Sequence, residues 1–131
     1  MKVGDELAPL AIGAITKEQI AQYSRAANDP NPMHVDEELA QAAGYPTVFA
    51  QGMLGMAFLA RYVEQLGGGP GCLRHIKVRF KTMTWPGEIV SCRARVTEIR
   101  DAEREQLVTC EIQTENERGE PKVVGTATYR V

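Results

Sequence analysis

The chain has 131 residues, 44% of them hydrophobic and 24% charged, and its formal net charge is −2. These values suit one globular domain with a core of its own, and they give no sign of a nucleic-acid partner or an acidic membrane surface. The first residues lack the apolar stretch of a signal peptide. The longest nearly uncharged apolar run, residues 45–60, is interrupted by Gln51, glycines and a proline and is short for a membrane span.

Residues 1–15 read as an irregular or weakly extended lead-in, because a proline and a glycine interrupt their apolar positions. Thr16 and Gln19 have the spacing of a capping box and start a predicted helix over Lys17–Ala27. That helix must end near Asn28, since a proline shortly afterwards disfavours helical geometry in the residue before it.

Two more helices are expected in the first half of the chain. Asp36 can cap a short helix over Glu37–Ala43, which Gly44 is well placed to end. The segment Gln51–Leu66 is apolar around almost its whole circumference. Such a helix is buried on most sides, so we expect it to be the central hydrophobic element of the domain.

From Leu73 onward the pattern changes from helical to alternating, which predicts strands. Apolar and polar residues alternate over 73–80, 90–97, 107–113 and 123–129, with turn residues between these segments. Four strands joined by short turns predict an antiparallel meander with one apolar face. Helices followed by strands indicate an α+β fold, with a curved sheet wrapped around Gln51–Leu66. Without internal repeats or linkers, we expect residues 1–131 to form a single domain.

The three cysteines, Cys72, Cys92 and Cys110, are odd in number and widely spaced. Zinc sites need closely spaced ligands, and secreted disulfide frameworks usually have an even number of cysteines. Two of the three fall on the apolar side of predicted strands, which favours packing. We therefore expect three reduced thiols in a cytoplasmic protein.

The segment 27–36 combines prolines, asparagines, aspartates and a histidine, a mixture that no regular helix or strand tolerates. Its prolines stiffen the backbone around Asp29 and Asn31. A stiff loop that carries Asp29 and His34 suits acid–base chemistry, because loops on a rigid scaffold often hold catalytic residues. From composition alone, a connector with a solvated Asp and His fits equally well.

Three runs together resemble the hydratase-2 signature of MaoC-like proteins, and the resemblance extends over nearly the whole chain. The runs are Asn28-Asp29-Pro30-Asn31-Pro32-Met33-His34-Val35-Asp36, Gly44-Tyr45-Pro46-Thr47 and Ala50-Gln51-Gly52-Met53-Leu54. The family comprises (R)-specific enoyl-thioester hydratases and 3-hydroxyacyl-thioester dehydratases. The resemblance implies a hot-dog fold and a substrate carried as an acyl-CoA or acyl carrier protein thioester. It implies no metal and no redox cofactor.

The resemblance also implies roles for individual residues. Asp29 and His34 match the catalytic pair that holds a water, with Asp29 as main general base and His34 orienting and polarising the same water. The amide of Gly52, at the start of the central helix, would stabilise the thioester oxyanion. The alternative for Gly52 is close helix packing. Asn31 is expected to shape the loop through hydrogen bonds to its backbone, and Pro32 is expected to be structural.

Two positions depart from the family pattern. Gln51 stands where many members have histidine, which need not impair catalysis if the donor is the backbone of Gly52. Some members carry a serine in the central helix that holds the aspartate, but Ala57–Ala60 contains no hydroxyl. Asp29 must then be oriented by the backbone or by water.

Other features are less specific. His75 lies on the polar side of its predicted strand and reads as a surface residue. A set of cations could form a phosphate-binding strip for coenzyme A or could be a solvated sheet face: Lys77, Arg79, Lys81, Arg93 and Arg95. An exposed sheet edge is usually paired or covered. The family typically does so by dimerising, so we expect a homodimer, or a pair with a related subunit.

Two other functions compete with hydration. A hot-dog thioesterase would direct water at the thioester carbonyl, and the intact Asp-x-Asn-Pro-x-His pattern argues against it. A non-catalytic acyl-thioester-binding subunit of a hetero-oligomeric dehydratase would be expected to have lost Asp29 or His34, and both are present.

Overall fold

A computed structural model describes all 131 residues of the chain. Its elements in chain order are β1 (Leu10–Ala14), α1 (Lys17–Ala27), a 3₁₀ turn (Pro32–His34), α2 (Glu37–Ala42), α3 (Gly52–Leu66), β2 (Leu73–Phe80), β3 (Ile89–Ala102), β4 (Glu105–Glu115) and β5 (Pro121–Arg130). The three predicted helices are all present, and α1 has the predicted bounds. Its cap is also as expected, because the Thr16 hydroxyl accepts a hydrogen bond from the Gln19 N–H at 3.0 Å.

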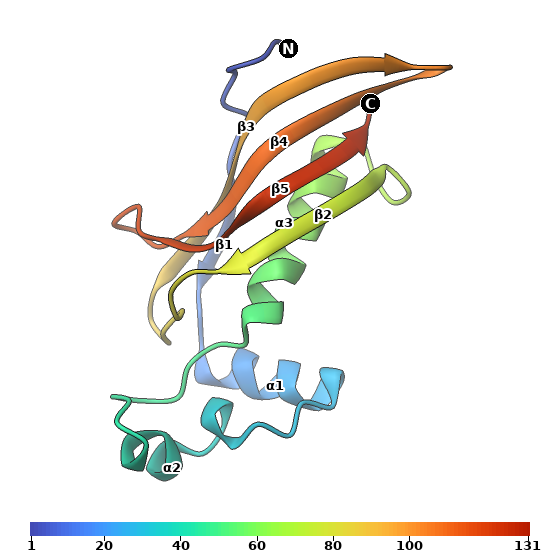
Figure 1. Cartoon of the computed structure of the whole chain (residues 1–131). Coiled ribbons are helices and arrows are strands. Elements are labelled where there is room, and N and C mark those ends of the chain that lie inside the picture. Colours follow the sequence, from blue (N-terminus) through green and yellow to red (C-terminus); the bar gives the residue numbers. More distant parts are fainter.

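The five strands form one antiparallel sheet in the order β1-β3-β4-β5-β2. The sheet curves over α3, and α1 and α2 lie together at one end of the molecule (Figure 1). The predicted α+β class, with a curved sheet around a central helix, is therefore confirmed. None of the helices combines the length and apolar character needed to cross a membrane.

The predicted four-strand meander is wrong in its order. Only β3, β4 and β5 follow one another in the sheet, whereas β2 pairs with the far side of β5. Gly125 on β5 makes this pairing possible, because a Cβ there would lie 2.8 Å from the Cα of Val78 on β2. Alternation identifies a strand and its inner face but not its neighbour, so the sequence pattern could not reveal the crossover.

The lead-in is more ordered than expected, since Leu10–Ala14 pairs with β3 as an edge strand. A bulge between Ala11 and Gly13 shifts its register, and Gly13 has a φ of +104°. That conformation is accessible to glycine and strained for other residues, which explains how a glycine can interrupt the apolar pattern without ending the strand.

The core lies between α3 and the inner face of the sheet. Leu59, Tyr62 and Val63 of α3 are fully or almost fully buried there. All three cysteines are free and buried, as predicted. Burial raises the pKa of Cys92 to about 12 and that of Cys110 to about 11, so both behave as packing residues rather than nucleophiles.

Candidate active site beside the start of helix α3

The proline-rich loop begins where α1 ends. Asn28 adopts a left-handed conformation with a φ of 53°, which turns the chain out of the helix. The next N–H, that of Asp29, donates to the Ser24 carbonyl at 2.9 Å. Asp29 is thereby fixed at its backbone to the last turn of α1.

Within the loop, short hydrogen bonds between side chains and backbone set the conformation. The Asn31 N–H donates to Asp29 Oδ1 at 3.0 Å, so the carboxylate is oriented by the backbone without a hydroxyl from α3. The Asn31 side chain accepts from the Met33 N–H at 3.1 Å and caps the 3₁₀ turn, whose first residue is Pro32. Both bonds are local, and a stiff loop results.

His34 is anchored to a different part of the chain. The side chain is 8% exposed, and Nδ1 lies 2.7 Å from the Phe49 carbonyl oxygen. A carbonyl only accepts, so Nδ1 carries a proton, and in the neutral form of the ring Nε2 keeps its lone pair. Nε2 lies 3.8 Å from Asp29 Oδ2, which is longer than a direct hydrogen bond. Two proton-accepting atoms therefore face each other at a distance that one water oxygen can bridge.

Helix α3 begins beside this pair. Gln51 is its N-cap but makes no side-chain capping bond, and the Gly52 N–H donates to no backbone carbonyl. A Cβ on Gly52 would lie 2.8 Å from the Phe80 ring, so the aromatic ring packs directly on the glycine backbone. The helix start thus presents a free N–H and its share of the helix dipole.

His34 and Gly52 line one cavity of about 300 Å³. Its wall comes from the 3₁₀ turn, the segment that leads into α3, the end of β2 with the segment that follows it, and β5. The lining residues are His34, Phe49, Ala50, Gln51, Gly52, Phe80, Lys81, Thr82, Met83, Thr84 and Val123. The structure thus brings two of the sequence-predicted residues to one hollow. Asp29 lies beside it, next to His34, while Asn31 and Pro32 belong to the loop and not to the wall.

One wall of the cavity is held by a buried lysine that the sequence analysis missed. Lys122, whose side chain is 1% exposed, donates from Nζ to the Met83 carbonyl at 2.8 Å and to Glu120 at 2.6 Å. It also pairs with Glu88 at 3.0 Å. These bonds tie the segment 81–88 to β5. Lys122 falls on a polar position of an alternating strand, so nothing in the pattern distinguishes it from a surface residue.

The pairing keeps Glu88 ionised inside the protein. Burial alone would raise the pKa of Glu88, but hydrogen bonds from Asn116, the Trp85 N–H and Lys122 outweigh it and lower the pKa. The Trp85 N–H donates at 2.6 Å and the Asn116 side-chain amide at 2.7 Å. A charge that is paired and fully hydrogen-bonded can be buried at tolerable cost.

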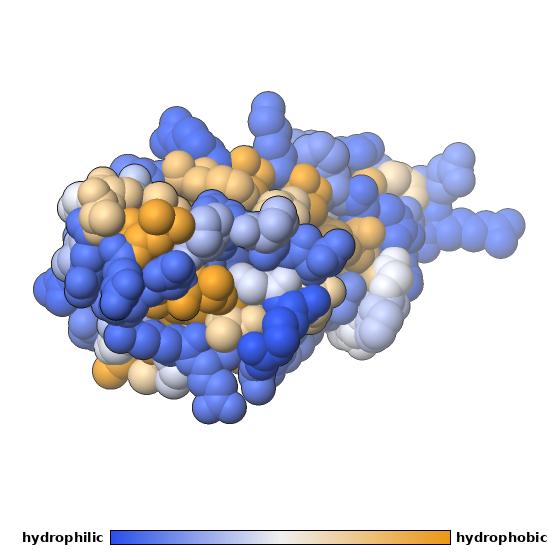
Figure 2. Space-filling model, turned by 90° about the horizontal axis from the view of Figure 1, so that it is seen from below, coloured by the Kyte–Doolittle hydropathy of each residue, from blue (hydrophilic) through white to orange (hydrophobic).

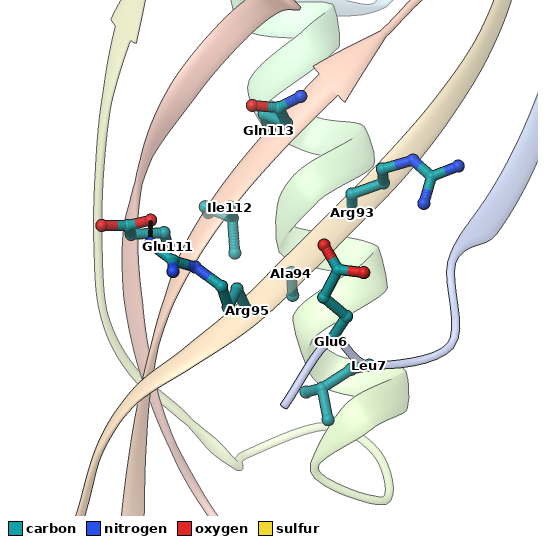
Figure 3. Close-up of a pocket in the computed structure, with 8 residues that line it drawn as sticks. All are labelled: Glu6, Leu7, Arg93, Ala94, Arg95, Glu111, Ile112 and Gln113. Carbon is teal, nitrogen blue, oxygen red and sulfur yellow. Dashed lines mark hydrogen bonds and ion pairs between the residues drawn. The ribbon is translucent and has the colours of Figure 1, made fainter. Parts of the chain in front are cut away.

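A second hollow, of about 180 Å³, lies over β3 and β4 and contains part of the predicted basic strip (Figure 3). Arg95 points to Glu111 and pairs with it at 2.8 Å, and Arg93 pairs with Glu115 at 3.0 Å. These two cations are neutralised on the outer sheet face and are not available as a free phosphate strip. His75 is exposed, as expected for a surface residue.

The MaoC like domain model matches residues 4–118 of the chain. A probable enoyl-CoA hydratase 2 from Dictyostelium discoideum is 29% identical over 94 residues, which cover 69% of this chain and 32% of the relative. The chain spans 3% to 32% of the length of the first curated relatives that it matches.

Two solved structures have the same fold. The (R)-hydratase from A. caviae superposes with a TM-score of 0.85 at 23% identity, covering 100% of this chain and 97% of the other. The ChsH1–ChsH2 complex from Mycobacterium tuberculosis gives a TM-score of 0.85 at 22% identity, covering 100% and 98%. These likenesses identify the sheet and its central helix as a hot-dog fold, and the matched residues show that the chain belongs to the MaoC-like domain family.

Proposed function

We propose that the protein hydrates trans-2-enoyl thioesters to (R)-3-hydroxyacyl thioesters, or catalyses the reverse dehydration. The observation that carries the proposal is the 3.8 Å separation of His34 Nε2 and Asp29 Oδ2 beside a cavity that also exposes Gly52. Membership of the MaoC-like family and the hydratase names of relatives support it.

The proposed first step is the attack of water on C3. A water that donates one hydrogen to Asp29 Oδ2 and the other to His34 Nε2 keeps its oxygen lone pairs free for the substrate. As the new C–O bond forms, Asp29 takes the proton as general base. The π electrons move towards the thioester, and a proton is then delivered to C2 through the same pair. Addition of one water therefore balances the reaction without a redox cofactor.

In this scheme the thioester oxygen becomes enolate-like and needs a hydrogen-bond donor. The free N–H of Gly52 at the start of α3 supplies one, and the helix dipole adds a partial positive charge. The missing Cβ lets the backbone approach the thioester closely. Lys81 lies in the cavity wall, and no carboxylate pairs with it, so it is a candidate for a phosphate of coenzyme A or of an acyl carrier protein.

Crotonyl-CoA tests the reaction and separates it from both competing functions. We expect loss of the enoyl absorbance without release of free thiol. Release of thiol would instead indicate a thioesterase. No reaction with enoyl thioesters of several chain lengths, on either carrier, would indicate a binding subunit and would refute the proposal.

Replacement of Gly52 by alanine tests the oxyanion role. The new Cβ would lie 2.8 Å from the Phe80 ring, but Phe80 is 54% exposed and can move, so we expect a folded protein. In the proposed scheme the new methyl group, or the ring that it displaces, narrows the space in which the thioester approaches the Gly52 N–H. We expect kcat/KM for crotonyl-CoA to fall by about a hundredfold, since a donor that the thioester oxygen cannot reach has the same effect as a missing oxyanion donor.

The double variant Gly52→Ala/Phe80→Ala separates a blocked backbone from a displaced ring, with Phe80→Ala alone as the reference. If Gly52→Ala lowers kcat/KM equally in both backgrounds, obstruction of the Gly52 backbone is the cause. A Gly52→Ala enzyme with nearly normal kcat/KM would refute the role proposed for this amide.

We further propose that the chain forms a homodimer. β2 is an edge strand with one unpaired side, and Met53 and Phe80 beside the cavity are 52% and 54% exposed. The end of the molecule that carries α1 and α2 shows apolar areas between hydrophilic ones (Figure 2).

Analytical ultracentrifugation of the isolated chain is expected to give twice the mass of one chain. A monomer at micromolar concentration would favour pairing with a related subunit, as in the hetero-complex among the structural neighbours.

A further inference from the structure

Gln51 is buried at the junction between the two halves of the site, with only 4% of its surface exposed. Its side-chain Nε2 donates to the Ile20 carbonyl at 2.9 Å and to the Ser24 hydroxyl at 2.7 Å, both on α1. These two bonds link the start of α3 to the first turn of α1, at Ile20, and to its second half, at Ser24. The N-cap position would suggest a capping role, but the side chain makes no capping bond.

The two ends of this link carry the two members of the proposed catalytic pair. On α1, the Ser24 carbonyl accepts the hydrogen bond from the Asp29 N–H at 2.9 Å. In the segment that leads into α3, the Phe49 carbonyl accepts a hydrogen bond from His34 Nδ1 at 2.7 Å. Gln51 lies two residues after Phe49 and directly before Gly52, so it closes a ring of contacts through Ser24, Asp29 and His34.

Helices α1 and α3 also pack against each other through apolar side chains. Ile20 packs in a small cluster with Ala50 and Leu54, among others. Apolar packing can hold two helices together, but it is not directional and does not set their positions as closely as two short hydrogen bonds do. The hydrogen bonds of Gln51 therefore fix the position of α3 relative to α1, whereas the apolar contacts hold the two helices together.

The environment of Gln51 also argues against a purely stabilising role. Its Oε1 is buried and accepts no hydrogen bond from any other group of the protein. Methionine would fill nearly the same space without a buried polar oxygen. Packing alone therefore does not require an amide at this position, and we attribute the role of Gln51 to the two hydrogen bonds that it donates.

We propose that Gln51 is a positioning residue that fixes the distance between Asp29 Oδ2 and His34 Nε2, and places both relative to the Gly52 amide. It touches none of the reacting atoms in this scheme. The inference rests on the proposed function, because it assigns to Gln51 the alignment of the water-activating pair with the oxyanion donor. Errors of about 1 Å in such alignment can cost a hundredfold in rate.

The variant Gln51→Met tests the proposal, since it keeps the side-chain volume and removes the donors. We expect kcat for crotonyl-CoA to fall by roughly tenfold to a hundredfold while KM stays within about threefold. The protein should stay folded, because the methionine fills the same space and removes the buried amide oxygen together with the two donated bonds. Gln65→Met is the matched control: it makes the same change on the exposed part of α3 and should leave kcat unaltered.

The same substitution made in an Asp29→Asn variant distinguishes a positioning role from a general disruption of the site. In Asp29→Asn, the main proton acceptor is already lost, so adding Gln51→Met should lower the residual rate by less than about threefold. An equal loss in both backgrounds, or a Gln51→Met enzyme with unaltered kcat, would overturn the inference.

A readout without turnover keeps this result separate from the proposed function. The chain has two histidines, so the ring signals of His34 and His75 can be resolved by NMR. Gln51→Met should move the signals of His34 and leave those of the exposed His75 in place. A wild-type protein that hydrates no enoyl thioester would refute the function, while unmoved His34 signals would refute the positioning role.

Discussion

Replacement of Asp29 by asparagine is expected to lower the rate of crotonyl-CoA hydration by about a thousandfold without unfolding the protein. Asparagine keeps a side-chain oxygen that can accept the Asn31 N–H, now bonded to Asp29 Oδ1 at 3.0 Å. The loop should therefore keep its shape. The amide cannot take a proton from water, so the general base is lost while the site remains assembled.

Steady-state kinetics with a circular-dichroism melting curve checks this expectation. Asp101→Asn is a suitable control, because it makes the same change at an exposed aspartate in the β3–β4 hairpin, away from the cavity. A rate within tenfold of the wild type for Asp29→Asn would show that another group removes the proton.

The second large effect is expected for His34→Asn, with a loss of about a hundredfold to a thousandfold in kcat. The side-chain NH₂ of asparagine can replace Nδ1 as donor to the Phe49 carbonyl, which His34 contacts at 2.7 Å. The variant therefore keeps the buried carbonyl paired and removes the acceptor Nε2. His34→Ala would remove both and leave that carbonyl without its partner.

Comparison of the two His34 variants separates chemistry from folding. If His34→Asn melts close to the wild type and hydrates slowly, Nε2 takes part in the reaction. If His34→Asn hydrates at the normal rate, then the histidine serves only to hold the loop against Phe49, and its proposed role is wrong.

Local signals in the sequence predicted the elements of this fold well. The Thr16 cap, the proline after Asn28 and the apolar segment before Gly67 each act over a few residues, and the bounds of α1 and α3 follow from them. The order of the strands depends on long-range pairing, such as the close approach of Gly125 to β2, which leaves only a glycine in the sequence.

The candidate site divides in the same way. The Asp29–His34 loop and Gly52 were identified from a compact motif, and the structure brings His34 and Gly52 to one cavity. The carboxylate is oriented by the Asn31 N–H, one of the two possibilities left by the absence of a hydroxyl in Ala57–Ala60. The contacts of Gln51 with Ser24 and of Lys122 with Met83 join residues far apart in the chain, so no local pattern could reveal them.

The most direct test of the central claim is the position of the oxygen that water adds. Crotonyl-CoA is incubated with the wild-type protein in ¹⁸O-labelled water, and the products are analysed by mass spectrometry. Attack by the water held between Asp29 and His34 predicts a single ¹⁸O in the C3 hydroxyl of an intact thioester. Label in a free carboxylate, or no labelled product at all, would contradict the account.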